Sequence, residues 1–206
     1  MFSKGTGKQT GDWTENQLHQ PVGGVVIFQT AIPWEIERGG TVLSGVGEQA
    51  LLAAPMTAFF ASRQCPGTAI RAAMDWALEE ARARHVVISG FHSPLEQSVL
   101  HLLLQACSPV VAVLARPIAD AQLKPDWKLA IAEGRMAVVS AGIETKRLTN
   151  ALAAQRNALV AQLAKRIVIA HASTGGELAR QSDSWVSRGL RVLNLAPSFP
   201  NGRIDS

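Results

Sequence analysis

Hydroxyl, glycine and arginine residues are concentrated in four short segments of this sequence, and each segment follows an apolar run. The segments are residues 61–67, 89–94, 115–117 and 171–176. Serine and threonine hydroxyls, backbone N–H groups at glycine turns and guanidinium groups are the donors that hold phosphate or carboxylate oxygens. Fourteen of the 20 cationic side chains are Arg, which can hold such oxygens through two parallel hydrogen bonds. The chemistry indicated is the binding of an anion.

Hydrophobic periodicity predicts the elements that must position these segments. Short apolar or β-branched runs alternate with longer segments in which apolar residues recur every three or four positions. The runs predict strands at 56–61, 85–89, 110–114, 136–139, 166–170 and 190–195. The longer segments predict helices at 66–83, 94–106, 126–132, 145–164 and 176–187. Such alternation is typical of βαβ units, so we expect an α/β fold with a doubly wound, mostly parallel sheet of about six strands, Rossmann-like in kind.

In an open parallel sheet, ligands bind at the carboxyl ends of the strands. The residues that this rule brings to one edge are Ser62, Arg63, Ser89, Gly90, Arg116, Ser173, Thr174, Gly175 and Gly176. Each also has a purely structural interpretation. The glycines could serve turns with positive φ, Ser62 could cap a helix, and Arg63 could pair with a helix carboxylate. Their convergence favours an anion site over these separate explanations.

No motif for a metal or a common cofactor accompanies these residues. The five His residues lack metal-ligand spacing, and neither a complete dinucleotide fingerprint nor a Walker lysine motif is present. We therefore expect no metal, no cofactor and no catalytic residue. Glu96 or Glu177, assisted by His92 or His171, would be the acid/base groups if the protein were an enzyme. Cys65 precedes a helix start, where a thiolate is stabilised, but a lone Cys is more often inert.

Composition limits the domain organisation and the compartment. The chain has 206 residues, 47% of them hydrophobic, and a net charge of +4. We expect a flexible tail over 1–20, an extension packed on the main domain over 21–55, the Rossmann-like domain over 56–197 and a tail over 198–206. In the extension, 25–28 predicts a short strand and the surrounding glycines predict turns around 41–43. Without a signal peptide, a long apolar span or paired cysteine spacing, a cytoplasmic protein with no membrane contact is expected.

Four motifs, in order, resemble the Rossmann-like domain of the DNA-processing protein A (Smf) family. They are Phe-Phe-Ala-Ser-Arg at 59–63, Ile-Ser-Gly-Phe-His-Ser-Pro-Leu-Glu at 88–96, Gln-Arg-Asn at 155–157 and Val-Ile-Ala-His-Ala-Ser-Thr-Gly-Gly-Glu-Leu at 168–178. Ala61 replaces the first glycine of the family's Gly-Ser-Arg loop, and Glu96 stands where the family has Asp. The resemblance implies a domain that binds single-stranded DNA, forms a homodimer and acts in recombination or DNA uptake.

The wider superfamily (SLOG) includes phosphoribohydrolases and binders of nucleotide-derived ligands. The phosphoribohydrolase signature would need Gly, Thr and Glu where this chain has Leu178, Ala179 and Ser182, which argues against that activity. The resemblance adds two residues, Arg156 and Asn157, to the expected site.

The resulting hypothesis is a non-catalytic binder of single-stranded DNA or of a nucleotide-like anion. The expected phosphate-binding residues are Ser62, Arg63, Ser89, Gly90, Arg116, Arg156, Asn157, Thr174, Gly175 and Gly176. Only Phe91 and Phe60 are aromatic near this edge, so a mononucleotide-sized ligand is a variant of the hypothesis. The alternatives are a nucleotide-processing enzyme, a sensor of a nucleotide-derived ligand, and a family member that has kept only a structural or regulatory role.

Overall fold

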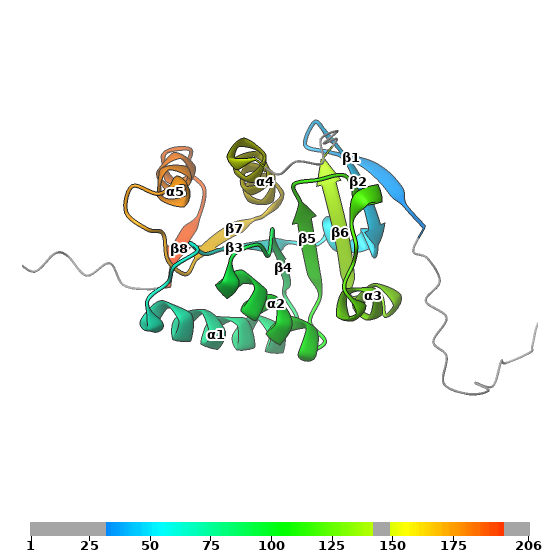
Figure 1. The fold of residues 1–206 in the computed structure, drawn as a ribbon, viewed down its shortest axis with the longest axis horizontal. Coiled ribbons are helices and arrows are strands. Elements are labelled where there is room, and N and C mark those ends of the chain that lie inside the picture. Colours follow the sequence, from blue (N-terminus) through cyan, green and yellow to red (C-terminus); the bar gives the residue numbers. More distant parts are fainter. Residues whose placement is uncertain (1–31, 142–148, 196–206) are drawn as a thin grey trace, which may run out of the picture.

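A computed structural model describes residues 32–141 and 149–195, which form one eight-stranded sheet covered by helices on both faces (Figure 1). The strands are β1 Trp34–Arg38, β2 Thr41–Gly47, β3 Met56–Phe60, β4 Val86–Ser89, β5 Val110–Leu114, β6 Met136–Ala141, β7 Arg166–Ile169 and β8 Val192–Asn194. Their order across the sheet is β1-β2-β6-β5-β4-β3-β7-β8. The predicted α/β fold is confirmed, and all six expected strands are present.

Within the group of six strands from β3 to β8, every neighbouring pair is parallel. The chain places β3, β4, β5 and β6 side by side in one direction, then returns and adds β7 and β8 on the other side of β3. The middle strands are buried along almost their whole length, as expected for a sheet with both faces covered.

The turn expected at Gly39–Gly40 is present, whereas Gly45 and Gly47, also expected to mark turns around 41–43, lie within strand β2. β1 and β2 form an antiparallel hairpin whose turn is Gly39–Gly40, both with positive φ, and β2 pairs antiparallel with β6. Two glycines in the left-handed region suit a two-residue hairpin loop. The expected extension thus contributes two further strands to the same sheet, and the expected strand at 25–28 lies outside the described residues.

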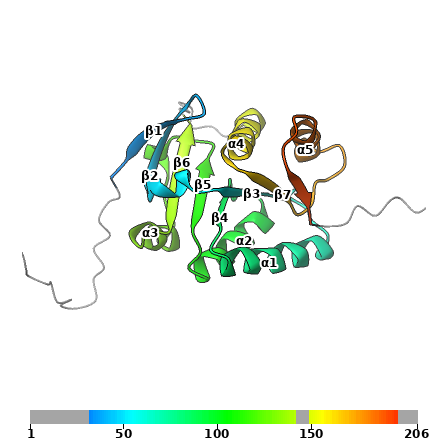
Figure 2. The ribbon, with the colours of Figure 1, turned by 180° about the vertical axis from the view of Figure 1, so that it is seen from behind.

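The helices form two layers. α1 Gly67–Arg82, α2 Pro94–Gln105 and α3 Pro125–Ala132 cover one face, whereas α4 Asn150–Leu163 and α5 Glu177–Ser187 cover the other (Figures 1 and 2). Two short 3₁₀ helices, Gln49–Ala53 and Ile118–Asp120, complete the elements. The helix expected to begin at 145 begins at Asn150, where the Thr149 hydroxyl accepts the N–H of Leu152, and residues 142–148 lie outside the described part.

Alternating residues of one strand build the core on both faces. Phe59 stacks on Trp76 of α1, and Phe60 stacks on Trp185 of α5, each with ring centroids 4.8 Å apart. Successive side chains of a strand point to opposite faces, so these two neighbours anchor one helix layer each. β3 is therefore fixed from both sides, and the loop that follows it starts from a rigid strand.

At the opposite, amino-terminal edge of the sheet, an ion pair joins β7 to α1. The Arg166 guanidinium at the start of β7 donates to both carboxylate oxygens of the buried Glu80 of α1, at 2.5 and 2.6 Å, and to the Thr57 hydroxyl at 2.7 Å.

No helix in the described part of the chain is long and apolar enough to cross a membrane.

Candidate functional site

The strand order creates a switch point between β3 and β7. The chain leaves β3 toward α1 on one face and leaves β7 toward α5 on the other, so the two loops diverge at the carboxyl edge. Ligands of doubly wound sheets bind in the crevice left at such a point. A hollow of about 730 Å³ lies here, lined by Ser62, Arg63, Gln64, Asn150, Ala151, Ala153, Ala154, Asn157, Ser173, Gly176, Glu177, Leu178 and Arg180.

Ser62 joins the two loops that form this hollow. Its backbone N–H donates to the His171 carbonyl at 2.9 Å, and its hydroxyl oxygen accepts the N–H of Ser173 at 2.9 Å. Ser62 is therefore not a helix cap, since Pro66 occupies that position in α1. Because the hydroxyl oxygen is used as an acceptor here, its proton is available to a ligand.

Glu96 fixes the backbone on the other side of the same loop. It lies in the first turn of α2 with only 5% of its surface exposed. One carboxylate oxygen accepts the Ala61 N–H at 3.1 Å, and the other accepts the N–H groups of His92 at 2.7 Å and Ser93 at 3.1 Å. Burial raises the pKa of Glu96, opposed by these hydrogen bonds and by the nearby Arg156. Ser93 is the N-cap of α2 and completes a capping box with Glu96.

Arg156 of α4 lies against Gly90 and explains why this glycine is needed. A Cβ at Gly90 would overlap the Nε atom of Arg156, whereas the φ of Gly90 is not positive. The structural interpretation of Gly90 as a positive-φ turn residue is therefore wrong, and close packing takes its place. Arg156 is 8% exposed, and burial lowers its pKa while Glu96 raises it.

Asn157 connects the two helices that flank the hollow. Its side-chain oxygen accepts from the Arg156 guanidinium at 2.9 and 3.2 Å, and its amide nitrogen donates to Gln181 of α5 at 3.1 Å. Gln181 in turn donates to the Ala154 carbonyl at 3.1 Å. Much of the hydrogen-bonding capacity of Asn157 is thus used within the protein, where it holds α4 against α5.

The turn before α5 brings backbone donors to the hollow. Gly175 has positive φ, but Gly176 does not; a Cβ at Gly176 would lie 2.9 Å from the Ser173 carbonyl oxygen. Gly176 is the N-cap of α5 and supplies no side-chain cap, so the first N–H groups of the helix are open to an anion. Glu177 pairs with Arg180 at 2.6 Å.

Not every expected site residue reaches the hollow. Ser62, Arg63, Asn157 and Gly176 line it, whereas Thr174 and Gly175 are exposed in the adjoining turn. Ser89 is fully buried, and its hydroxyl accepts the N–H of Phe91, so it shapes the loop rather than touching a ligand. Arg116 is exposed after β5, which is two strands away from β3, and does not line the hollow.

Two titratable groups near this edge favour their neutral forms. Burial, followed by the charges of Arg156 and Arg63, lowers the pKa of His92. Burial, followed by the charge of Glu96, raises the pKa of Cys65, whose thiol donates to the Ser62 carbonyl at 3.2 Å. Both effects favour the thiol form of Cys65. In residues 32–141 and 149–195, no group of three His, Cys, Asp or Glu could hold a metal ion.

Sequence reasoning missed Asn150 and Arg180, which both line the hollow. Asn150 is the first residue of α4 and Arg180 lies one turn into α5. Both residues lie in the first turns of helices that follow strands, and this position could have marked them as site candidates. To place them in one site, however, one must know that α4 and α5 lie side by side on the same face (Figure 1).

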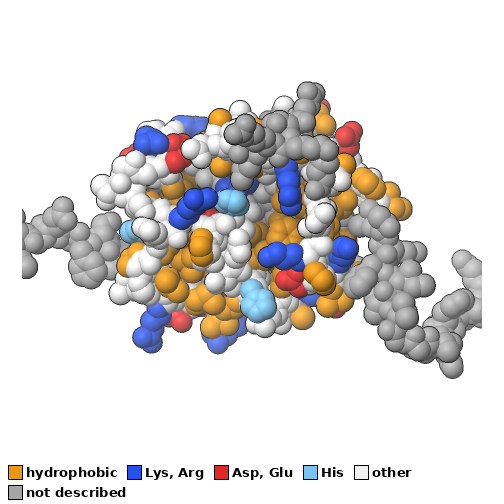
Figure 3. Space-filling view, viewed as in Figure 1, with side chains coloured by type: hydrophobic (Ala, Val, Ile, Leu, Met, Phe, Trp, Pro, Cys, Tyr) orange, Lys and Arg blue, Asp and Glu red, His pale blue; other side chains and the backbone are white. Residues whose placement is uncertain are grey.

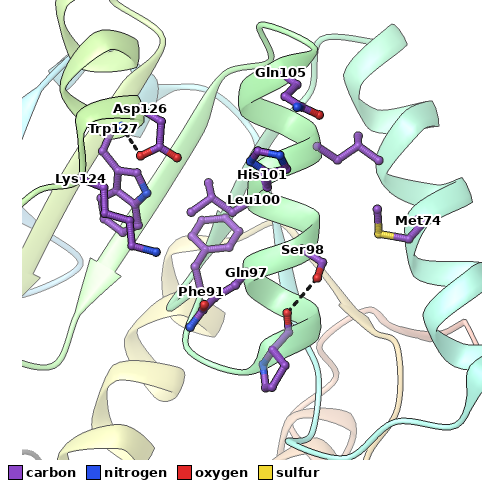
Figure 4. Close-up of a pocket in the computed structure, with 12 residues that line it drawn as sticks. Met74, Phe91, Gln97, Ser98, Leu100, His101, Gln105, Lys124, Asp126 and Trp127 are labelled. Carbon is purple, nitrogen blue, oxygen red and sulfur yellow. Dashed lines mark hydrogen bonds between the residues drawn. The ribbon is translucent and has the colours of Figure 1, made fainter.

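A second hollow, of about 710 Å³, lies away from this edge, on the helix layer formed by α1, α2 and α3. Figure 3 shows hydrophobic side chains exposed over α1 and α2, with single Lys, Arg and His side chains scattered among them. Figure 4 shows its lining, in which α2, with Gln97, His101 and Gln105, lies between Trp127 on one side and Met74 on the other. Since its lining comes mostly from the helix layer, with only Phe91 from the loop after β4, we do not assign the anion site to it.

The architecture matches two solved structures of DNA processing protein A. The protein from Streptococcus pneumoniae has 18% identity and a TM-score of 0.67, over 86% of this chain and 67% of that one. The protein from Helicobacter pylori has 15% identity and a TM-score of 0.67, over 84% of each chain, and its structure describes a single-stranded DNA binding mode of that protein. At these identities the likeness shows the fold. No curated protein sequence matches the chain.

A family model identifies the chain more directly. The model of DNA recombination-mediator protein A matches residues 31–182, which includes the Ser62 loop, the Glu96 loop, the Arg156-Asn157 pair and the turn before α5. The resemblance drawn from the four motifs is thereby confirmed. Because the match covers well over half of its length, the chain belongs to the DNA recombination-mediator protein A family, a family of DNA processing and recombination.

Proposed function

We propose that this protein binds single-stranded DNA through the sugar-phosphate backbone, at the hollow between β3 and β7, and does no chemistry on it. The observation that carries the proposal is the set of donors gathered there: the guanidinium groups of Arg63 and Arg180, the Ser62 hydroxyl and the uncapped N-terminus of α5. Family membership and the single-stranded DNA binding of the Helicobacter pylori protein support the choice of ligand.

The charge around the hollow suits a polyanion. Arg63 is exposed and forms no ion pair with another described residue, so its charge is available to a phosphate. Glu177 is the only carboxylate among the lining residues, and it is paired with Arg180. Arg156 lies behind Gly90 and adds a buried positive charge at the same edge.

The bases themselves have few partners here. Phe60 and Phe91, the aromatic residues expected near this edge, are both buried, Phe60 beneath α5 and Phe91 against the second hollow. Sequence-tolerant binders usually stack bases on exposed aromatic rings, at about 1–3 kcal/mol per base. We therefore expect phosphate contacts to supply most of the affinity.

The volume of the hollow favours one further candidate, a mononucleotide. About 730 Å³ falls within the range typical of small-molecule sites, about 300–1,000 Å³. A nucleoside monophosphate would use the same donors for its phosphate. Competition separates the two ligands, because a mononucleotide that is the true ligand displaces an oligonucleotide at a concentration well below that of inorganic phosphate.

The test is fluorescence anisotropy of a labelled oligothymidylate in 50 mM salt. Arg63→Ala should weaken binding about tenfold, the usual order of effect for losing one charge-assisted phosphate contact. The matched control is Arg82→Ala, because Arg82 is also an exposed arginine and lies at the far end of α1. Absence of binding by the unaltered protein, or equal effects of both substitutions, would overturn the proposal.

We also propose that the protein forms a homodimer, as the family resemblance implies. Val186 of α5 and Leu193 of β8 are 58% and 55% exposed and belong to the two elements at one margin of the sheet. Apolar side chains so exposed beside an edge strand favour a contact with another copy of the chain.

A further inference from the structure

We propose that Glu96 is a positioning residue, whose ionised carboxylate holds the Ser62–Arg63 loop in the shape that binds the ligand. This inference rests on the proposed function and concerns a residue that is not itself in the hollow. Glu96 accepts a hydrogen bond from the backbone N–H of Ala61 in this loop, while Ser62 and Arg63 line the hollow.

The hydrogen bonds of Glu96 exceed what helix capping requires. A capping box needs the glutamate at the third helical position to accept one N–H, that of the cap residue Ser93. Glu96 also accepts the N–H of His92 and, with its other oxygen, the N–H of Ala61, which lies 35 residues earlier in the chain. One buried side chain therefore joins the loop after β3 to the loop after β4.

Position makes this link consequential for Arg63. Ala61 is the first residue after β3. The next residue, Ser62, is hydrogen-bonded to the loop after β7, at His171 and Ser173. The backbone that carries Arg63 is thus fixed on both sides, by Glu96 toward β4 and by Ser62 toward β7. Losing one attachment returns conformational freedom to the loop, and ligand binding must then restrict it again.

Ionisation is required by the donor count. A carboxylate accepts through both oxygens and donates nothing, so it satisfies three N–H groups together. A glutamine at this position presents an NH₂ group to at least one of these N–H donors, and that contact becomes repulsive. Glu96→Gln therefore removes the link between the loops while preserving size and shape.

The experiment compares Glu96→Gln with two matched controls. Glu80→Gln neutralises a carboxylate that is as deeply buried but lies at the opposite edge of the sheet, and Ser93→Ala weakens the cap of α2 without touching Ala61. Two quantities are measured for each folded variant: amide hydrogen exchange at Ala61, without DNA, and affinity for the labelled oligothymidylate.

Glu96→Gln should speed exchange at Ala61 and weaken DNA binding, each about tenfold, the range expected for freeing one ordered backbone position. The two controls should leave both readouts within about twofold. Unchanged exchange and affinity in Glu96→Gln, or equal losses in Glu80→Gln or Ser93→Ala, would overturn the inference. If the unaltered protein fails to bind DNA, the proposed function fails, whereas exchange at Ala61 still reports whether Glu96 orders the loop.

Discussion

At the scale of single residues, the site depends on close contacts between side chains from distant parts of the chain. Gly90 is restricted by Arg156, 66 positions later, and Ala61 is held by Glu96. Because of these contacts, the fold requires particular residue types at positions that look ordinary in the sequence. Two predictions address them without any ligand, so they test the geometry apart from the function.

Gly90→Ala should destabilise the protein by about 1–3 kcal/mol, the usual cost of forcing an extra carbon into a packed site. The added Cβ would overlap the Arg156 guanidinium, which is buried and has little room to move. Gly67→Ala is the matched control, since a Cβ there meets nothing within 4 Å and the position starts α1. Denaturant unfolding measures both; equal stabilities of the two variants would contradict the packing argument.

The ionisation of Glu96 should make stability depend on pH. The pKa of Glu96 in the folded protein is raised above its ordinary value of 4.5. Between pH 4.5 and that raised pKa, the native state therefore binds more protons than the unfolded state. The Glu96 contribution to the free energy of unfolding is thus fully present below pH 4.5 and is lost as pH rises through the folded pKa. The titratable and charged groups near Glu96 are Arg156 and Cys65, and His92 contacts it through its backbone N–H.

Unfolding of the unaltered protein and of Glu96→Gln, compared from pH 4 upward, measures this contribution. The stability of the unaltered protein relative to the variant should fall with rising pH. A difference that stays constant over that range would show that the carboxyl is not perturbed by burial. The loss of stability is the cost of keeping an ionised group where it can order the binding loop.

At the scale of elements, helix α5 contributes both a terminus and a charge to the hollow. Arg180 donates to the Gly175 carbonyl at 3.0 Å and pairs with Glu177, so the first turn of the helix and the turn before it form one unit. Sequence periodicity predicts α5 and most of its length, because amphipathic spacing is local. It does not predict which helix lies beside it.

Arg180→Ala should weaken binding of the oligothymidylate about tenfold, since it removes a guanidinium and leaves Glu177 unpaired at the ligand edge. Arg188→Ala is the control on the same helix, at its C-cap and away from the hollow. Anisotropy titrations should show an effect of about twofold or less for the control. Equal affinities of the two variants would show that α5 is not part of the binding surface.

At the scale of the whole molecule, the proposed DNA binding and the proposed dimer would use different parts of the surface. The hollow proposed to hold phosphates lies at the carboxyl edge of the sheet, whereas the exposed apolar residues Val186 and Leu193 lie on α5 and β8 at one margin. Salt weakens the first kind of contact, since neutralised phosphates release counterions. Apolar contacts strengthen or stay constant under the same change.

Affinity for single-stranded DNA should therefore fall linearly on a plot of log affinity against log salt, with a slope of about −0.7 per phosphate contact. Arg63→Ala should make that slope shallower by about one contact, while Arg82→Ala leaves it unchanged. Titrations between 50 and 200 mM salt measure it. A slope near zero would indicate a ligand held by other than phosphate contacts.

The mass of the protein in solution should be that of a dimer, and it should not change over the same salt range. Val186→Asp with Leu193→Asp should shift the mass to that of a monomer, because both changes put charge on an apolar contact. Leu129→Asp, at an exposed position of α3, is the control. Light scattering decides the matter, and a dimer that survives the double substitution would place the interface elsewhere.

The sequence by itself determined strands β3 to β8, the helices that follow them and the chemical character of the loops, but not the β1–β2 hairpin. Strand and helix positions follow from local periodicity, and the donors after the strands follow from residue type, so 61–63 and 173–176 could be found without coordinates. Tertiary structure alone decided the rest, because strand order and helix adjacency arise from contacts between distant residues. It placed β7 beside β3, so that Ser62 meets Ser173, and it left Arg116 two strands away. It also joined the β1–β2 hairpin to β6 and used Glu96 to hold the loop that carries Arg63.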